Sequence, residues 1–420
     1  MGGTLDGSSS IGLTAIQEGE TMRDIARSRT ARLIGVAVVG AIALSACGGS
    51  STSTESSAAP AATEAAASSA APVEECTTPT PVKLQLQWFV QSQFAGYYAA
   101  KDKGFYADEC LDVTILEGGV DIVPQTVLAQ GGADFALAWV PKALASREQG
   151  ALITDVAQVF QKSGTLQVSW ADSGITSAAD FKGKKIGNWG FGNEFEVFAA
   201  ITQAGLDPAT DVELVQQQFD MLALLNREID AAEAMTYNEY AQLLEAKNPE
   251  TGELYTPEDF NVINYSNEGV GMYQDAIWAS TERLADPAYQ AITQKFVTAS
   301  LAGWIYCRDN AQACADIITA NGSKLGASHQ LWMMNEVNKL IWPSPAGIGI
   351  IVPEIWAQTV SVATTAKNLE GATVITAEPA ADSYTNTYAE AANAKLTAAG
   401  LNTTGDAFAP LSVTLKEGGN

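Results

Sequence analysis

The sequence has few of the residues on which many catalytic and nucleic-acid-binding proteins depend. Its 420 residues include one histidine, His329, and five cysteines. Lysine and arginine together number 23 against 48 acidic residues, which gives a formal net charge of −25. Binding a phosphate backbone needs a concentrated basic surface, and no basic cluster occurs beyond the N-terminal region. The composition therefore argues against a nucleic-acid partner and is typical of a soluble protein in an ionic or extracellular medium.

Catalytic and metal-binding patterns are equally scarce. His329 lies in a segment with a helical pattern and has no evident carboxylate partner, so a Ser-His-Asp triad has little basis and we interpret the histidine as structural or surface-exposed. No Cys-x-x-Cys pair is present, which leaves little for a zinc or haem site. Many Asp and Glu residues occur, but no spacing singles out a catalytic pair. We therefore predict no catalytic residue, no metal and no cofactor.

No apolar run reaches the length of about 20 residues that spans a bilayer. The segment Leu33–Ala46 is apolar, follows four arginines (Arg23, Arg27, Arg29 and Arg32) and ends in Leu-Ser-Ala-Cys-Gly. This pattern predicts a signal peptide over residues 1–47 and lipid attachment at Cys47, as at a bacterial lipobox; the alternative is an ordinary buried helix. Met22, directly before the basic region, is the expected start of translation.

The next segment, residues 48–81, is rich in Ser, Ala, Thr, Pro and Glu and predicts a disordered tether. The four cysteines beyond Cys47 are even in number, which in an exported chain favours disulfides, although four thiols allow three pairings. Cys76 and Cys110 each precede a predicted strand, and if those strands are parallel neighbours a bridge between them is natural. Cys307 and Cys314 flank a turn, where a bridge would join two helices.

Strand patterns alternate with helical ones from residue 82 onward. Strands are predicted at 82–88, 111–118, 133–139 and 151–161, and again at 184–189, 211–218, 228–237, 261–266 and 272–280. The alternation predicts an α/β protein with parallel sheets and right-handed crossovers. We expect a first lobe over 82–170 plus 275–400 and a second over 171–274, joined by two hinge crossings, with a tail at 401–420. Helical patterns at 287–307, 310–321, 327–340 and 353–367 predict a helical C-terminal part.

Aromatic side chains stand at the ends of several predicted strands. Trp88, Trp139 and Trp189 each end one strand, and Tyr237 ends another. Ligands of open parallel sheets bind outside the carboxyl ends of the strands. A single tryptophan at a strand end is usually a core residue, but three at corresponding ends favour a shared site. We therefore predict that these rings meet across the gap between the lobes.

Amides and further rings surround these positions. The stretch after the first strand contributes Gln93, Phe94 and Tyr97, the glycine-rich loop at 187–196 contributes Asn193 and Glu194, and Asn238 follows Tyr237. Rings stack on the faces of a flat heteroaromatic ligand while amides bond its edges. Glu194 and Glu196 lie at the start of the helix after the loop and disfavour a phosphate there. A neutral ligand is expected.

Residues 82–365 resemble the solute-binding lipoproteins of ABC importers, within the superfamily shared with thiamine pyrimidine synthase. The resemblance rests on the motifs QWFVQSQFAGYYAAKDKGFYADECLDVTI, GNWGFGNEFEVFAAITQAGL, QQQFDMLALLNREIDAAEAMTYNEYAQ and LAGWIYCRDN. It implies a periplasmic-binding-protein-like fold of type II and a riboflavin-like or thiamine-precursor pyrimidine ligand. It also implies an ABC permease and its ATPase as partners, and a monomer held by a lipid anchor on the extracytoplasmic face of the cell membrane.

Two other classes of function compete with this interpretation. The synthase of the same superfamily would use a cofactor-binding lysine and a consumed histidine, but those positions hold Ala138 and Lys142 in our alignment, and its cysteine-rich run has no counterpart near 262–275. A structural or adhesive surface lipoprotein would need neither a hinge nor converging rings. We therefore expect a transport component that is not an enzyme.

Overall fold

The computed structural model describes residues 76–420. The predicted signal peptide, the start at Met22, the lipidation of Cys47 and the tether up to residue 75 lie outside the described residues. Residues 76–81, which we assigned to the tether, include Cys76 of a disulfide and the beginning of the first strand. The predicted tether boundary at residue 81 is therefore too late, because Thr80 already pairs with Leu111 in a sheet.

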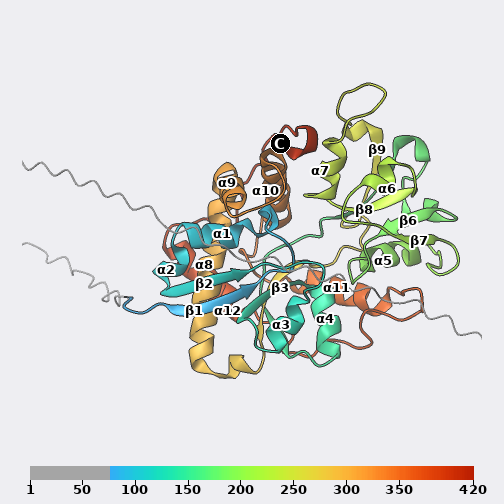
Figure 1. Ribbon diagram of the computed structural model, residues 1–420. Helices are drawn as coiled ribbons and strands as arrows, with labels where there is room; N and C mark the ends of the chain where they lie inside the picture. The colour runs from blue at the N-terminus through green and yellow to red at the C-terminus, as the bar shows by residue number, and fades with distance from the viewer. Residues whose placement is uncertain (1–75) are drawn as a thin grey trace, which may run out of the picture. The chain divides into compact units, whose positions relative to one another are not determined.

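Two five-stranded sheets organise the described residues (Figure 1), as the α/β prediction requires. The first sheet has the order β2-β1-β3-β10-β4 and consists of β1 (Thr80–Gln85), β2 (Leu111–Leu116), β3 (Phe135–Trp139), β4 (Ile153–Gln158) and β10 (Asp275–Ser280). The second sheet has the order β7-β6-β8-β5-β9 and consists of β5 (Thr165–Trp170), β6 (Lys185–Asn188), β7 (Glu213–Gln216), β8 (Ala231–Met235) and β9 (Phe260–Asn264).

Both sheets are mixed, which corrects the prediction of purely parallel sheets. Strand β10 runs antiparallel to β3 and β4, and β5 runs antiparallel to β8 and β9. The chain enters each of these two strands directly from a strand of the other sheet: β5 follows β4, and β10 follows β9. No helical crossover brings them back to the starting edge, so nothing imposes the parallel direction on them.

The two chain crossings follow β4 and β9. Strand β5, which lies within the predicted first lobe of 82–170, pairs only with strands of the second sheet. The first crossing therefore falls between Gln158 and Thr165 rather than near residue 170. The second crossing falls between Asn264 and Asp275 and ends at the predicted lobe boundary between residues 274 and 275. The division into two lobes as separate folding units stays a prediction.

Helices pack on both sheets. Along the first half of the chain these are α1 (Ala95–Asp102), α2 (Phe105–Asp108), α3 (Pro124–Ala129), α4 (Val140–Glu148), α5 (Phe195–Gln203), α6 (Leu222–Leu225) and α7 (Glu239–Leu244). The helical C-terminal part contains α8 (Pro287–Asp309), α9 (Ala311–Ala320), α10 (Ala327–Ile341), α11 (Pro353–Thr365) and α12 (Thr387–Ala398). No helix between residues 76 and 420 is both long and apolar enough to cross a membrane.

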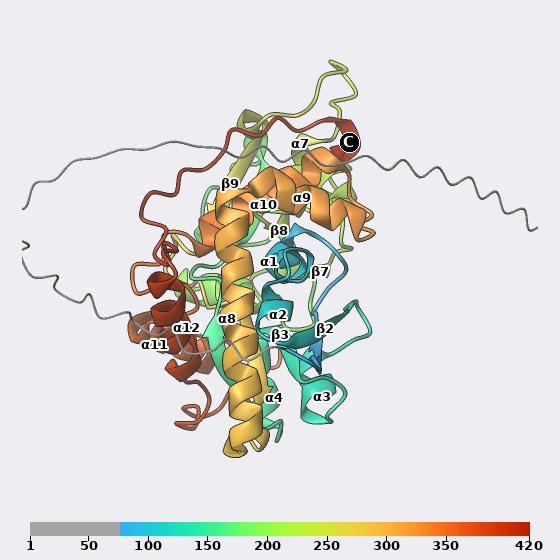
Figure 2. The ribbon, with the colours of Figure 1, turned by 90° about the vertical axis from the view of Figure 1, so that its left-hand side faces the viewer.

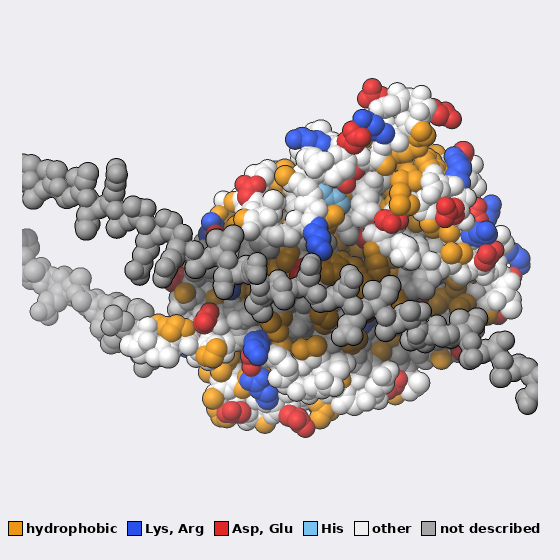
Figure 3. Space-filling model, in the orientation of Figure 1, with side chains coloured by type: hydrophobic (Ala, Val, Ile, Leu, Met, Phe, Trp, Pro, Cys, Tyr) orange, Lys and Arg blue, Asp and Glu red, His pale blue; other side chains and the backbone are white. Residues whose placement is uncertain are grey.

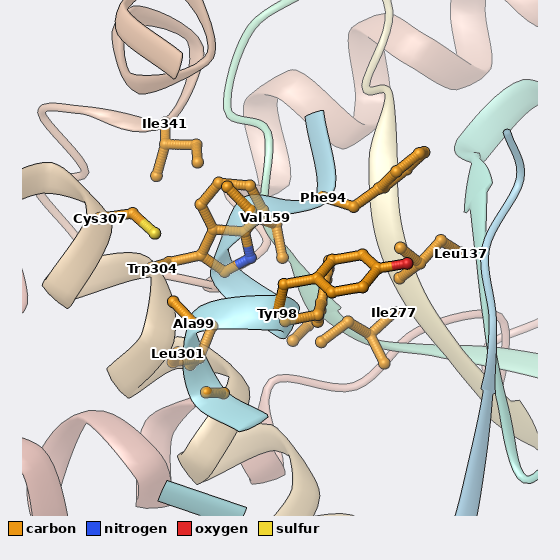
Figure 4. Packing of buried hydrophobic residues seen from close by; sticks show 14 of the residues in the cluster. Phe94, Tyr98, Ala99, Leu137, Val159, Ile277, Leu301, Trp304, Cys307 and Ile341 are labelled. Carbon is orange, nitrogen blue, oxygen red and sulfur yellow. The ribbon is translucent and has the colours of Figure 1, made fainter. Parts of the chain in front are cut away.

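The long helix α8 organises the core next to the first sheet. Figure 2 shows it between α1 on one side and α12 on the other, and both helices contact it. Its Trp304 is fully buried and lies beside Cys307, Val159 and Ile341 (Figure 4). The C-terminal helices therefore complete the first sheet's core, as predicted, although α11 contacts both α4 and α5.

Disulfides join Cys76 to Cys110 and Cys307 to Cys314. The first bridge lies where β1 and β2 begin, because the two strands are parallel neighbours with Thr80 opposite Leu111. The second joins α8 to α9 across the turn at Asn310. Four thiols allow three pairings. The structure has the pairing in which one disulfide links the starts of two neighbouring strands and the other links two consecutive helices.

Candidate functional site

A cavity of about 410 Å³ lies between residues of the first sheet and residues of the second. Its aromatic lining comes from both sides. Two rings belong to the first side, Trp88 and Trp139, and five belong to the second, Trp189, Phe191, Phe195, Phe219 and Tyr237. The volume lies within the range of about 300–1,000 Å³ that is usual for small-molecule sites. The four rings predicted from strand ends therefore line one cavity.

The strand ends place these rings, with small shifts from the predicted boundaries. Trp139 is the last residue of β3, Trp189 follows β6 directly, and Tyr237 lies two residues beyond β8. Trp88 lies three residues beyond β1, because β1 ends at Gln85 and not at residue 88. Gly118 makes room for this segment: a Cβ there would lie 2.4 Å from the Trp88 backbone nitrogen.

Phe219 is one of three lining rings that the sequence did not predict, with Phe191 and Phe195. It lies in the loop after β7, and its ring centroid is 4.7 Å from that of Trp88 at an interplanar angle of 53°. Its centroid lies 6.5 Å from that of Trp189, and those two planes differ by only 15°. Phe219 thus joins an indole of the first lobe to one of the second. The motif QQQF, a ring just after a strand, is the same signal that identified the other four.

Three predicted site residues lie elsewhere. Phe94 and Tyr97 are buried in the core beside α8, where Tyr97 packs edge-on against Trp304 at 5.6 Å. They are three residues apart at the start of α1, so helical geometry points both toward the core instead of the cavity. Glu194 does not line the cavity either; its carboxylate accepts a hydrogen bond from the Gly192 backbone N–H at 2.9 Å.

The predicted amides Gln93, Asn193 and Asn238 do line the cavity, but protein partners already occupy many of their polar atoms. The Asn193 Oδ1 accepts a hydrogen bond from the Lys142 ammonium at 2.7 Å, across the two sides of the cavity. The Asn238 side chain donates to the Glu239 carboxylate at 2.8 Å. Asn193 therefore also links the two walls through Lys142, and a role of the three amides in ligand binding stays a prediction.

His329 has the carboxylate partner that the sequence did not reveal. The histidine lies in α10, is 1% exposed, and places its Nδ1 2.9 Å from the Glu245 carboxylate just after α7. Its Nε2 lies 3.0 Å from the Asn238 Oδ1. The structural interpretation fits this position, since the imidazole ties α10 to α7 behind the cavity wall; a surface position does not.

Burial shifts the titration of three groups at the cavity. It raises the pKa of Asp275 to about 7 against the lowering effect of hydrogen bonds from Gln93 and Trp139. It likewise raises the pKa of Glu239 to about 7. It lowers the pKa of Lys142 to about 8, while Glu194, Glu233 and Asp275 act in the opposite direction. Within residues 76–420, no three His, Cys, Asp or Glu side chains form a cluster that fits a metal ion.

These carboxyl groups predict that the protein unfolds more readily as the pH rises from about 5 to 8. Burial raises the folded-state pKa of Asp275, Glu239 and Glu196 from 3.8 or 4.5 to about 7, so the folded state holds protons that the unfolded state releases in this interval. Stability therefore falls with rising pH, by about 2 kcal/mol or more for each of the three groups. Lys142 contributes a change mainly above pH 8.

Urea denaturation at pH 5 and pH 8 measures this difference. The variant Glu239→Gln removes one of the three titrating carboxyl groups. It should therefore reduce the difference between the urea midpoints measured at pH 5 and at pH 8. A midpoint that is higher at pH 8 than at pH 5 would contradict the assignment.

Apolar side chains border the mouth of the cavity. Val120 and Val123 precede α3 on the first side and are about half exposed, and Phe191 stands opposite with 72% of its surface exposed. Phe191 has a φ of 56° between two glycines that also have positive φ, so this turn holds the ring away from its own lobe. Hydrophobic side chains gather in the middle of the face seen in Figure 3.

Comparison with solved structures places the fold. The periplasmic aliphatic sulphonate-binding protein SsuA of Escherichia coli superposes with a TM-score of 0.50 at 14% sequence identity, covering 80% of this chain and 94% of that protein. The two mixed sheets joined by two crossings thus define a two-lobed periplasmic-binding-protein fold. At this level of identity the likeness concerns the fold alone.

The chain belongs to the NMT1/THI5-like family, whose model matches residues 91–313. The formylaminopyrimidine-binding protein of Halalkalibacterium halodurans is 22% identical over 57% of this chain, and the riboflavin-binding protein RibY of Chloroflexus aurantiacus is 26% identical over 53%. The matches cover 70% and 61% of those proteins. A 4-amino-5-hydroxymethyl-2-methylpyrimidine phosphate synthase of Legionella pneumophila is 26% identical over 31% of this chain and 41% of its own length. The matches to the two solute-binding proteins thus cover more of this chain than the match to the synthase does.

Proposed function

We propose that this protein is the lipid-anchored solute-binding component of an ABC importer, located on the extracytoplasmic face of the cell membrane. It binds a flat heteroaromatic compound between its lobes, closes by a hinge motion at the two crossings, and delivers the compound to a permease driven by an ATPase. The protein acts as a monomer. The observation that supports this most is the meeting of seven aromatic side chains from both lobes in one cavity.

The lining favours a neutral or nearly neutral ligand. Lys142 is the one Lys or Arg among the described residues that line the cavity, and its ammonium already bonds Asn193 and lies 4.9 Å above the Trp139 ring. A phosphorylated ligand would need more positive charge than this. Riboflavin, with its extended ring system, is our first candidate, and a thiamine-precursor pyrimidine is the second.

Mass spectrometry of the compound released from natively purified protein tests the proposal. We expect a riboflavin-like or aminopyrimidine compound, and we expect the same compound to raise the unfolding free energy by about 2.7 kcal/mol at 100 times its Kd. Calorimetric titration with riboflavin and with 4-amino-5-hydroxymethyl-2-methylpyrimidine provides the direct check. Failure of both to bind below about 1 mM, together with an empty extract, would refute the proposal.

A synthase-like enzyme is the second candidate, and one observation favours it: Lys142 presents an amine with a pKa lowered to about 8 inside the cavity. Against it, Ala138 occupies the position where the resemblance implies the cofactor-binding lysine. Incubation with pyridoxal phosphate separates the two functions. We expect no imine absorbance band, whereas a band that disappears in Lys142→Met would favour the enzyme.

A further inference from the structure

A buried carboxylate behind the inner wall of the cavity accepts hydrogen bonds from side chains of that wall. Asp275, the first residue of β10, is 2% exposed and accepts hydrogen bonds from three side chains that line the cavity. These donors are the Gln87 Nε2 at 2.6 Å, the Gln93 Nε2 at 3.0 Å and the Trp139 Nε1 at 2.9 Å. Each donor comes from a segment at or beyond the carboxyl end of β1 or β3.

This carboxylate determines which way the neighbouring amides face. An ionised carboxylate only accepts hydrogen bonds, so Gln87 and Gln93 must both turn their NH₂ groups toward it. The side-chain carbonyl of Gln93 then accepts a hydrogen bond from the Gln91 Nε2 at 2.7 Å. Gln91 therefore turns its NH₂ group toward Gln93. The carbonyl oxygens of Gln87 and Gln91 accept no hydrogen bond from any residue between 76 and 420. The segment with Gln87 and Gln91 therefore offers acceptors on the first side of the cavity.

The opposite wall offers a donor. Trp189 is 4% exposed and lines the cavity, and its indole Nε1 has no hydrogen-bond partner among the described residues. A buried N–H without a partner costs free energy, about 1–3 kcal/mol, which a ligand acceptor would recover. The cavity thus presents the carbonyl oxygens of Gln87 and Gln91 on one side and the Trp189 N–H on the other.

We propose that Asp275 is a positioning residue that makes the cleft select heterocycles with an N–H donor on one edge and an acceptor on the other. Exocyclic amines of aminopyrimidines and the ring imide of isoalloxazines present such N–H edges. The inference rests on the proposed function and narrows its ligand class. It assigns to Asp275 a role in ligand choice that works through Gln87 and through the Gln93–Gln91 pair.

Matched ligand pairs test this role, with Kd measured by calorimetry at pH 8. Lumiflavin is compared with 3-methyllumiflavin, and 4-amino-5-hydroxymethyl-2-methylpyrimidine with its 4-dimethylamino derivative. In whichever pair binds to the wild-type protein, the compound with the N–H should have a Kd about tenfold lower or more than its methylated partner. The reason is that methylation removes the donor and leaves a carbonyl of the cavity wall unpaired. In Asp275→Asn this ratio should fall to about threefold or less, because an amide at 275 both donates and accepts, and allows a glutamine to reverse.

Asp155→Asn is the control: Asp155 is also a fully buried carboxyl of the first sheet, but its partner is the Ala157 backbone N–H, and it should keep the wild-type ratio. If Asp275→Asn does not fold, Gln91→Met removes one acceptor and should lower the same ratio. Equal affinity of both members for the wild-type protein, or an unchanged ratio in the variants, overturns the inference while the proposed function stands. If no member of either pair binds below about 1 mM, both fail.

Discussion

The variant Trp189→Ala loses about 100-fold in affinity for riboflavin or for the aminopyrimidine, whichever the wild-type protein binds. Trp189 contributes a ring nearly parallel to Phe219 and the unpartnered N–H on the second-lobe wall. Loss of base stacking on an aromatic ring costs about 1–3 kcal/mol, and loss of one hydrogen bond about 0.5–1.5 kcal/mol. At 1.4 kcal/mol for each factor of ten, their sum corresponds to about two orders of magnitude.

Two further variants separate these contributions. Trp189→Phe keeps a ring but lacks the N–H, so we expect a loss of about tenfold at most. Trp356→Phe makes the same chemical change in a buried indole that packs against Tyr384 outside the cavity, and should leave the affinity unchanged. Calorimetric titration gives all four values. An affinity of Trp189→Ala within threefold of the wild type would show that the ring does not contact the ligand.

The variant Gly303→Val destabilises the folded protein by about 3 kcal/mol or more. Helices α1 and α8 cross where two glycines meet: a Cβ on Gly303 would lie 2.0 Å from the Gly96 carbonyl oxygen and 2.9 Å from the Ala100 Cβ. A Cβ on Gly96 would in turn lie 2.2 Å from the Trp304 ring. Any side chain here must separate the two helices, because backbone atoms cannot move aside as a flexible side chain does.

Ala291→Val is the matched control for this crossing. It places the same valine side chain at an exposed position of the same helix and should cost only the lower helix propensity of valine, about 0.5 kcal/mol. Urea denaturation of both variants gives the difference. Because α1 continues the segment with Trp88, Gln91 and Gln93, we also expect weaker ligand binding in Gly303→Val. Equal stability of the two variants would mean that α1 and α8 do not cross this closely.

The local signals in the sequence were sufficient to place four of the seven aromatic residues that line the cavity. Trp139, Trp189 and Tyr237 come at or just after a strand end, and the carboxyl ends of neighbouring parallel strands lie at one edge of a sheet. Phe219 follows the same rule, since it comes directly after the predicted strand at 211–218, but only the three tryptophans and Tyr237 were assigned to the site. Phe94 and Tyr97 were placed in the site wrongly, since the direction of a helical side chain depends on where the helix begins.

Contacts between distant segments were beyond the reach of these signals. Asp275 meets Gln93 across 182 residues of chain, and His329 meets Glu245 across 84. Nothing local distinguishes Asp275 from the many solvated carboxylates of this acidic chain. Its role follows from burial beside three donors, and burial at the start of β10 depends on the antiparallel pairing of that strand with β3 and β4.

The sequence by itself determined the α/β class, the location of most strands and helices, the aromatic character of the site and the family resemblance, because each of these depends on residues close together along the chain. Only the tertiary structure decided the direction of β5 and β10, which amides face the cavity, and which carboxylates are buried. The physical reason is that strand pairing between distant segments and the removal of water from a polar group both depend on the whole packed arrangement, which no single stretch of residues encodes.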